Sequence, residues 1–114
     1  MEEHILVGLS SAPSNARIIR TAATMAAAFG CKFTALFVRT PGYDAMSEEN
    51  KERLRTNTEL AKSLGATVET VFGDDVSYQI AEYARLSGVT KIVVGRSAAT
   101  RKHPWGSFLT LLMA

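Results

Sequence analysis

Hydroxyl side chains gather in two segments that each follow an apolar run, and in the second they are joined by glycines and basic residues, a combination typical of an anion site. The first segment follows the run His4–Leu9 and contains Ser10, Ser11 and Ser14. Hydroxyls and the free N–H groups at the start of a helix donate hydrogen bonds to phosphate oxygens, and the helix dipole favours negative charge there. We therefore expect these three serines to contact the phosphate or sugar of a ligand.

The second segment, residues 95–107, has a glycine near each end and basic residues between them. A glycine lets the backbone approach a ligand closely, and a proline at 104 predicts a helix start with free N–H groups just after it. A polar loop with solvated basic side chains stays open as the alternative, because the spacing matches neither a Walker loop nor a dinucleotide fingerprint. The candidate nucleotide-binding residues here are Gly95, Arg96, Ser97, Gly106 and Ser107.

Two further loops complete the candidate site. Thr40 follows the second apolar run, and Gly73 follows the third, where it would give a base access to the backbone. Asp74 and Asp75 form a carboxylate pair of the kind that holds Mg²⁺ in phosphoacceptor domains, but capping of the next helix by Asp75 is the simpler interpretation. Neither a nucleophilic triad nor a metal-ligand cluster is recognisable, so we expect no catalytic residue and no metal.

Alternating strand and helix patterns bring these loops together. Apolar, β-branched runs predict four strands, and helical spacing with N-cap residues and closing glycines predicts the helices between them. This order is typical of a three-layer α/β fold with a parallel sheet, in which ligands bind beyond the carboxyl ends of the strands. The predicted strands are 4–9, 31–38, 66–73 and 89–95, and the predicted helices are 14–29, 47–64, 74–88 and one that begins at 104.

The helix patterns also predict which side chains face the sheet. The second helix presents a thin apolar stripe and the third an amphipathic face. Ser14 or Asn15, Ser47 and Asp75 are the expected N-caps. The inward residues predicted on these two helices are Leu54, Ala61, Leu64, Val76, Ile80, Tyr83 and Ala84.

Length and composition exclude several classes of protein. The chain has 114 residues, a net charge of +2 and 46% hydrophobic residues, as expected for a single domain spanning 1–114. No apolar stretch reaches the length of a membrane span, and one tryptophan among a few basic residues is a weak basis for nucleic-acid binding. The single cysteine, Cys31, is expected to be a small buried residue, and His4 to be structural. We expect a cytoplasmic domain that contacts neither nucleic acid nor membrane.

Three segments resemble the universal-stress-protein-like domain of the potassium-sensing (Kdp) sensor histidine kinases. They are "ILVGLSSAPSNARIIRTAATMAAAFGCKFTALFV", "SEENKERLRTN" and "GDDVSYQIAEYARLSGVTKIVVGRS". A shorter match, "GSFLTLL", follows them, so the resemblance covers essentially the full chain from Ile5. The resemblance implies the universal stress protein (adenine nucleotide alpha hydrolase-like) fold with strand order 3-2-1-4. It further implies a non-catalytic regulatory domain of a two-component sensor kinase, in the cytoplasm, with the parent protein in the inner membrane of a bacterium and its other domains as partners.

The resemblance also implies a missing fifth strand. Stress-protein domains have a strand after the last helix, and this chain stops at Ala114, inside the predicted helix. The fourth strand would then lie at an open edge, which seeks a partner. We expect either a homodimer through that edge or the C-terminal helix, or a cover formed by the apolar tail "FLTLLMA".

The ligand implied by the resemblance is ATP or cyclic di-AMP. ATP-binding stress proteins have Gly-x-x-Gly, nine residues and then Gly-Ser or Gly-Thr after the fourth strand, and an aspartate after the first. Here Gly95 matches, Ala98 replaces the second glycine, Gly106-Ser107 comes two residues early, and serines stand in place of the aspartate. Two rival functions stay open: a stand-alone ATP-binding stress protein, and an interaction module without a ligand.

Cyclic di-AMP-binding relatives are similar to this chain in a second pattern, Ser-x-Ser after the first strand and Phe-Thr-Ala-x-Tyr in the second. The matching residues are Ser10, Phe33, Thr34 and Ala35, whereas Ala12 and Phe37 each lack the hydroxyl of the pattern. A lost hydrogen bond of this kind costs about 0.5–1.5 kcal/mol. Packing of the aromatic residues in the core is the alternative interpretation of the second strand.

Overall fold

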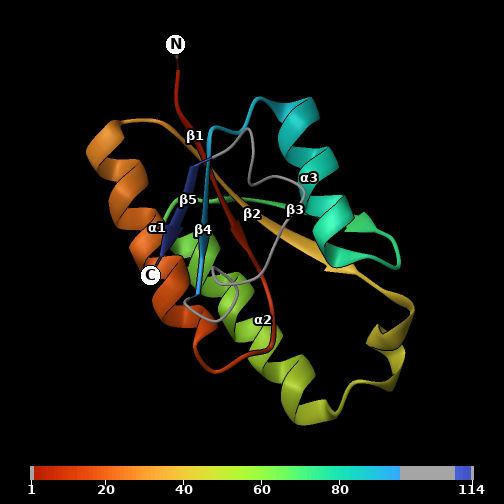
Figure 1. The fold of residues 1–114 in the computed structure, drawn as a ribbon. Coiled ribbons are helices and arrows are strands. Elements are labelled where there is room, and N and C mark those ends of the chain that lie inside the picture. Colours follow the sequence, from red (N-terminus) through yellow and green to blue (C-terminus); the bar gives the residue numbers. More distant parts are fainter. Residues whose placement is uncertain (1, 96–109, 114) are drawn as a thin grey trace.

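The computed structural model describes residues 2–95 and 110–113, which form one β-sheet with helices packed against it (Figure 1). The sheet order is β3-β2-β1-β4-β5, and each neighbouring pair is parallel. This confirms the predicted parallel sheet and the order 3-2-1-4. The elements are β1 (His4–Gly8), α1 (Asn15–Phe29), β2 (Lys32–Arg39), the 3₁₀ helix η1 (Pro41–Ala45), α2 (Glu48–Ser63), β3 (Thr67–Phe72), α3 (Val76–Ser87), β4 (Lys91–Val94) and β5 (Thr110–Met113).

The C-terminal prediction is wrong, because a fifth strand is present. Thr110–Met113 forms β5 and pairs with β4 in parallel register from Lys91↔Thr110 to Val94↔Met113. A short apolar run does not distinguish a helix from a buried strand, and pairing satisfies the backbone groups along the β4 edge. That edge is therefore covered by the chain's own tail, as one of the two alternatives had it, and is not free for a homodimer. The predicted helix start at 104 lies outside the described residues.

Both faces of the sheet are covered, which gives three layers. Successive strand residues point to opposite faces, so Ile5 and Val7 pack in one buried cluster with residues of α1 and α2. Leu6 packs in a second cluster, with residues of α3. The inner strands β1 and β4 are apolar on both faces because each face is buried there, as is usual in parallel sheets, whereas the edge strand β3 is largely exposed. The layers can be followed in Figure 1.

The predicted caps are mostly confirmed. Ser47 Oγ accepts a hydrogen bond of 3.1 Å from a first-turn N–H of α2, and Asp75 Oδ1 accepts one of 3.1 Å in α3. Gly30 ends α1 with a φ of 62°, a left-handed conformation that glycine adopts without strain. Ser14 occupies the N-cap position of α1, but its side chain makes no capping hydrogen bond.

Two predicted core positions are wrong. Leu54, Ala61 and Ala84 are buried as expected, but Leu64 is 37% exposed and Val76 is 46% exposed. Leu64 follows the last turn of α2, and Val76 is the first residue of α3. Helical spacing alone does not show that side chains at the ends of a helix are more exposed than those in its middle.

Candidate functional site

A cavity of about 440 Å³ lies at the carboxyl ends of β1, β2 and β4. Its lining includes four of the predicted site residues, Ser10, Ser11, Thr40 and Gly95, which come from three different loops. Parallel strands place their carboxyl ends at one edge, and this is why residues so far apart in sequence meet. Of the other candidates, Ser14 and Gly73 are not among the lining residues, and Arg96, Ser97, Gly106 and Ser107 lie outside the described residues.

The walls of this cavity, which we name the rim cavity, are mostly apolar. Aliphatic and aromatic side chains come from both sheet faces, and the polar groups come from the loops and from Asn15 at the start of α1. Such a lining suits a flat, largely apolar ligand held by a few polar anchors. The apolar lining residues include Leu6, Ile18, Leu36, Phe37, Val38, Met46, Val76, Ile80, Ile92 and Val94.

Two glycines shape the rim cavity in different ways. A Cβ added at Gly8, on the last residue of β1, would meet no atom within 4 Å. A Cβ added at Gly95 would lie 3.1 Å from Ile18 Cδ1, which is tighter than ordinary contact. The backbone of Gly8 therefore faces open space in the cavity, whereas Gly95 is packed against α1.

The loop after β1 is held by buried amide side chains. Asn15, 3% exposed, donates from Nδ2 to the Gly8 carbonyl at 2.9 Å and accepts from the Ser10 N–H at 3.2 Å. From α2, Asn57, 4% exposed, donates to the Ser10 carbonyl at 2.9 Å. These bonds satisfy loop backbone groups that an open turn leaves unpaired. Asn15 is thus a structural residue of the loop, not a capping one.

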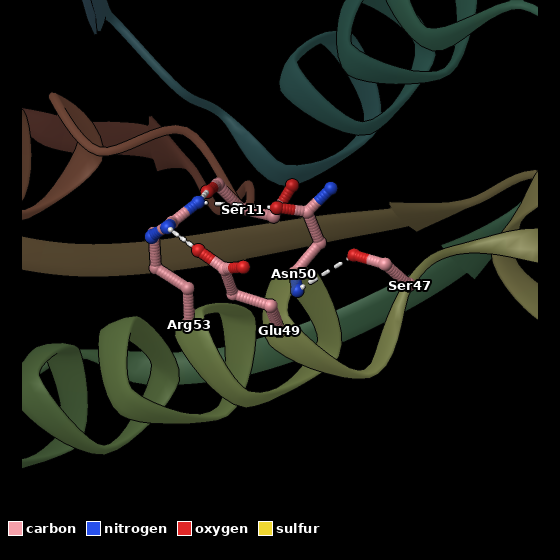
Figure 2. A network of polar contacts seen from close by, with 5 residues as sticks. All are labelled: Ser11, Ser47, Glu49, Asn50 and Arg53. Atoms are coloured by element: carbon pink, nitrogen blue, oxygen red, sulfur yellow. Dashed lines mark hydrogen bonds and ion pairs between the residues drawn. The ribbon is translucent and has the colours of Figure 1, made fainter.

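A guanidinium from α2 adds a further anchor (Figure 2). Arg53 donates from Nη1 to the Ser11 carbonyl at 3.1 Å and to Asn50 Oδ1 at 3.1 Å, and from Nη2 to Glu49 at 3.1 Å. The sequence reasoning on site residues missed these α2 side chains. Their spacing at 50, 53 and 57 places them on one helix face, and polar residues there, beside a buried leucine, were the available signal.

At the opposite edge of the sheet, formed by the amino-terminal ends of the strands, His4 has a structural role. His4 is 8% exposed, and its Nδ1 lies 3.1 Å from the Ser87 carbonyl, which can only accept. Nδ1 therefore carries a hydrogen, and Nε2 lies 2.8 Å from the Thr34 hydroxyl, within hydrogen-bond distance. Thr34 is buried and its hydroxyl is used within the fold, away from the rim cavity. Cys31 nearby is half-buried, more exposed than expected.

Glu3 and Lys91 form an ion pair near the amino-terminal ends of β1 and β4. The hydrogen bond from Lys91 lowers the pKa of the Glu3 carboxyl below its ordinary value. Within residues 2–95 and 110–113, no group of three or more His, Cys, Asp or Glu side chains is arranged to hold a metal ion. In the same residues, no helix has the length and hydropathy needed to cross a bilayer.

Solved structures of universal stress proteins share this fold. A universal stress protein in complex with cAMP matches with a TM-score of 0.69 and 22% identity, over 99% of this chain and 96% of that one. The Archaeoglobus fulgidus universal stress protein in complex with dAMP matches with a TM-score of 0.63 and 21% identity, over 97% and 96%. The chain has the universal stress protein fold, and its class is a universal-stress-protein-like domain.

Sequence similarity gives the type of domain, although no family model matches the chain. The sensor protein KdpD of Clostridium acetobutylicum is 42% identical over 95 residues, which are 83% of this chain and 10% of that protein. KdpD of Mycobacterium tuberculosis is 34% identical over 100 residues, 87% of this chain and 11% of that protein. The chain is a universal-stress-protein-like domain of the KdpD family, as the sequence resemblance predicted. It spans about a tenth of the length of these relatives.

Proposed function

We propose that this domain binds an adenine nucleotide in the rim cavity and regulates a potassium-sensing histidine kinase of a two-component system. The observation that carries the proposal is the meeting of Ser10, Ser11, Thr40 and Gly95 around an apolar cavity at the carboxyl edge of a parallel sheet. Two proteins of the same fold are described in complex with cAMP and dAMP. Both ligands share the adenine base and a phosphate.

The regulatory role rests on the similarity to KdpD. In this proposal the domain has no catalytic activity of its own, lies on the cytoplasmic side of a bacterial inner membrane, and has the other domains of the kinase as partners. Residues 1–114 act as one ligand-responsive unit.

Where this chain departs from the ATP and cyclic di-AMP patterns, it indicates how well each nucleotide is expected to bind. Ala98 replaces a glycine of the ATP pattern, so we expect ATP to bind weakly at best through the loop after β4. For cyclic di-AMP, the Thr34 hydroxyl is bonded to His4, so its contribution to the ligand is lost, while Phe37 does line the rim cavity. Adenosine is therefore the simplest probe, since it contains only the base and sugar that every candidate shares.

A size series at Gly8 tests the proposal. Gly8 is the last residue of a regular strand, and a Cβ there meets no neighbour within 4 Å, so Ala is expected to fit without strain. Val and Leu are expected to extend further into the cavity. We expect calorimetry to show adenosine binding to the wild-type domain, weaker binding to Gly8→Ala, and none to Gly8→Leu. Melting curves serve as the folding control, and adenosine at 100 times its Kd adds about 2.7 kcal/mol to wild-type stability.

Two results would contradict the proposal. Gly8→Leu that binds adenosine as the wild type does would place the ligand elsewhere. A wild-type domain whose melting temperature does not move with millimolar adenosine, ATP or cyclic di-AMP would favour an interaction module without a ligand.

A further inference from the structure

A second groove of about 330 Å³ lies between α2 and the β2–β3 part of the sheet, and we name it the α2 groove. Leu9, Phe37 and Tyr43 line both the α2 groove and the rim cavity, so the two spaces adjoin. Their chemistry differs sharply, because the rim cavity is mostly apolar while the α2 groove is basic. The basic residues lining the groove are Arg39, Lys51, Arg55 and Lys62, against one acidic residue, Glu59.

Tyr43 holds two of these cations at the boundary between the spaces. The Arg39 guanidinium carbon lies 4.1 Å from the centroid of the Tyr43 ring, and Lys51 Nζ lies 5.4 Å from it. Phe37 packs edge-on against the same ring, with centroids 5.9 Å apart. Cation–π contacts at these distances are attractive and position the charged groups without neutralising them. Two positive charges are therefore gathered on one ring beside the rim cavity.

The carboxylates around these cations leave them available to a ligand. Arg39 pairs with Asp44 at 3.3 Å, but the two side chains are 42% and 86% exposed, and such a pair is weak. Lys62 pairs with Glu59 and Arg55 with Glu52 in similarly exposed i,i+3 pairs on α2. Among the described residues, Lys51 forms no ion pair, so its charge is the least compensated of the four.

We infer that Arg39 and Lys51 bind the phosphate chain of the nucleotide, which runs from the rim cavity past Tyr43 into the α2 groove. This inference rests on the proposed function and adds the orientation of the ligand. The base is expected in the apolar rim cavity, since a charged phosphate is poorly solvated there. The charged end is expected beside the cations, because hydrogen bonds between ionised groups are the stronger ones. The ligand class is an adenosine phosphate with an extended chain.

The gain in affinity that the phosphate groups add to adenosine tests this orientation. Calorimetry at constant salt and without Mg²⁺ gives the affinity of each variant for adenosine, AMP and ATP. We expect Lys51→Gln and Arg39→Gln each to lower the ratio of ATP to adenosine affinity about tenfold, the effect of roughly one charge-assisted hydrogen bond. The matched control is Arg85→Gln on α3, which removes the same charge from an arginine paired only with Glu82. It is expected to keep the wild-type ratio.

The outcomes separate this inference from the proposed function. Absence of binding of adenosine, AMP and ATP alike overturns the proposed function, and the orientation with it. Binding of adenosine and ATP with the same ratio in Lys51→Gln, Arg39→Gln and Arg85→Gln overturns the orientation alone and leaves the rim cavity as the nucleotide site. A ratio lowered in the first two variants and kept in the third supports both.

Discussion

Removal of the Asn57 side chain is expected to loosen the loop that forms one wall of the rim cavity. Asn57 is 4% exposed and its Nδ2 donates to the Ser10 carbonyl at 2.9 Å. Asn57→Ala removes the donor and leaves that carbonyl without its partner from α2. This hydrogen bond is partly buried, and an unpaired group in a buried site costs about 1–3 kcal/mol, a sizeable part of the roughly 5–15 kcal/mol that stabilises a small domain.

The assay is urea denaturation followed by circular dichroism, with Thr56→Ala as the matched control. Thr56 is an exposed neighbour on α2, and threonine and asparagine have similar helix propensities, so both substitutions gain about the same from alanine. We expect Asn57→Ala to be about 1–3 kcal/mol less stable than Thr56→Ala, and to melt lower by roughly 4 °C per kcal/mol.

Hydrogen exchange separates a local effect from a global one. The amides of residues 9–12 are expected to exchange faster in Asn57→Ala than the change in global stability explains, because the loop opens on its own. Equal stabilities of Asn57→Ala and Thr56→Ala, with unchanged exchange in the loop, would refute the view that α2 anchors this wall.

Two further predictions concern the helix caps and the amino-terminal ion pair. Ser47→Ala is expected to lower the free energy of unfolding by about 1 kcal/mol, because the Ser47 hydroxyl caps α2. Ser14→Ala is expected to lower it by only a few tenths of a kcal/mol, because Ser14 makes no capping hydrogen bond. Thermal or urea unfolding measures both, and equal losses would contradict the assignment of the caps. The pKa of Glu3 is lowered in the folded state, so its contribution to stability is present at neutral pH and lost as pH falls through that lowered pKa. Glu3→Gln should therefore be less stable than wild type at pH 7 and equal to it in acid, and a difference that grows in acid would contradict this sign.

The first four strands and the three helices between them were predictable from the sequence for physical reasons, whereas their order in the sheet, 3-2-1-4, was implied by the family resemblance. Strands buried on both faces must be apolar throughout, and helices between them must bury one stripe, so the alternation is visible without coordinates. Caps such as Ser47 and Asp75 are equally visible, because only short polar side chains reach the free N–H groups. The last element, β5, was not predicted, since a short apolar run is compatible with a helix or a strand. Its strand conformation depends on pairing with β4, which the local sequence does not show.

The candidate site was only partly predictable. Loops at the carboxyl ends of the strands must converge, which is why Ser10, Thr40 and Gly95 were expected together and line one cavity. The roles of Asn57 and Arg53 were not predicted, because their partners are backbone carbonyls of a distant loop, and a sequence carries no pattern for such bonds. The α2 groove was also missed, because three of its cations lie along α2 and their approach to Arg39 of β2 depends on tertiary packing around Tyr43.

The most direct test of the account is the amide chemical-shift map of the domain during an adenosine titration. We expect the largest shifts around the rim cavity, in residues 8–12 and 40–46 and at Gly95, and no change at the opposite edge around His4, Lys32 and Gly65. Shifts concentrated at that opposite edge, or on the exposed face of α3, would contradict the claim that the carboxyl ends of the strands form the binding site.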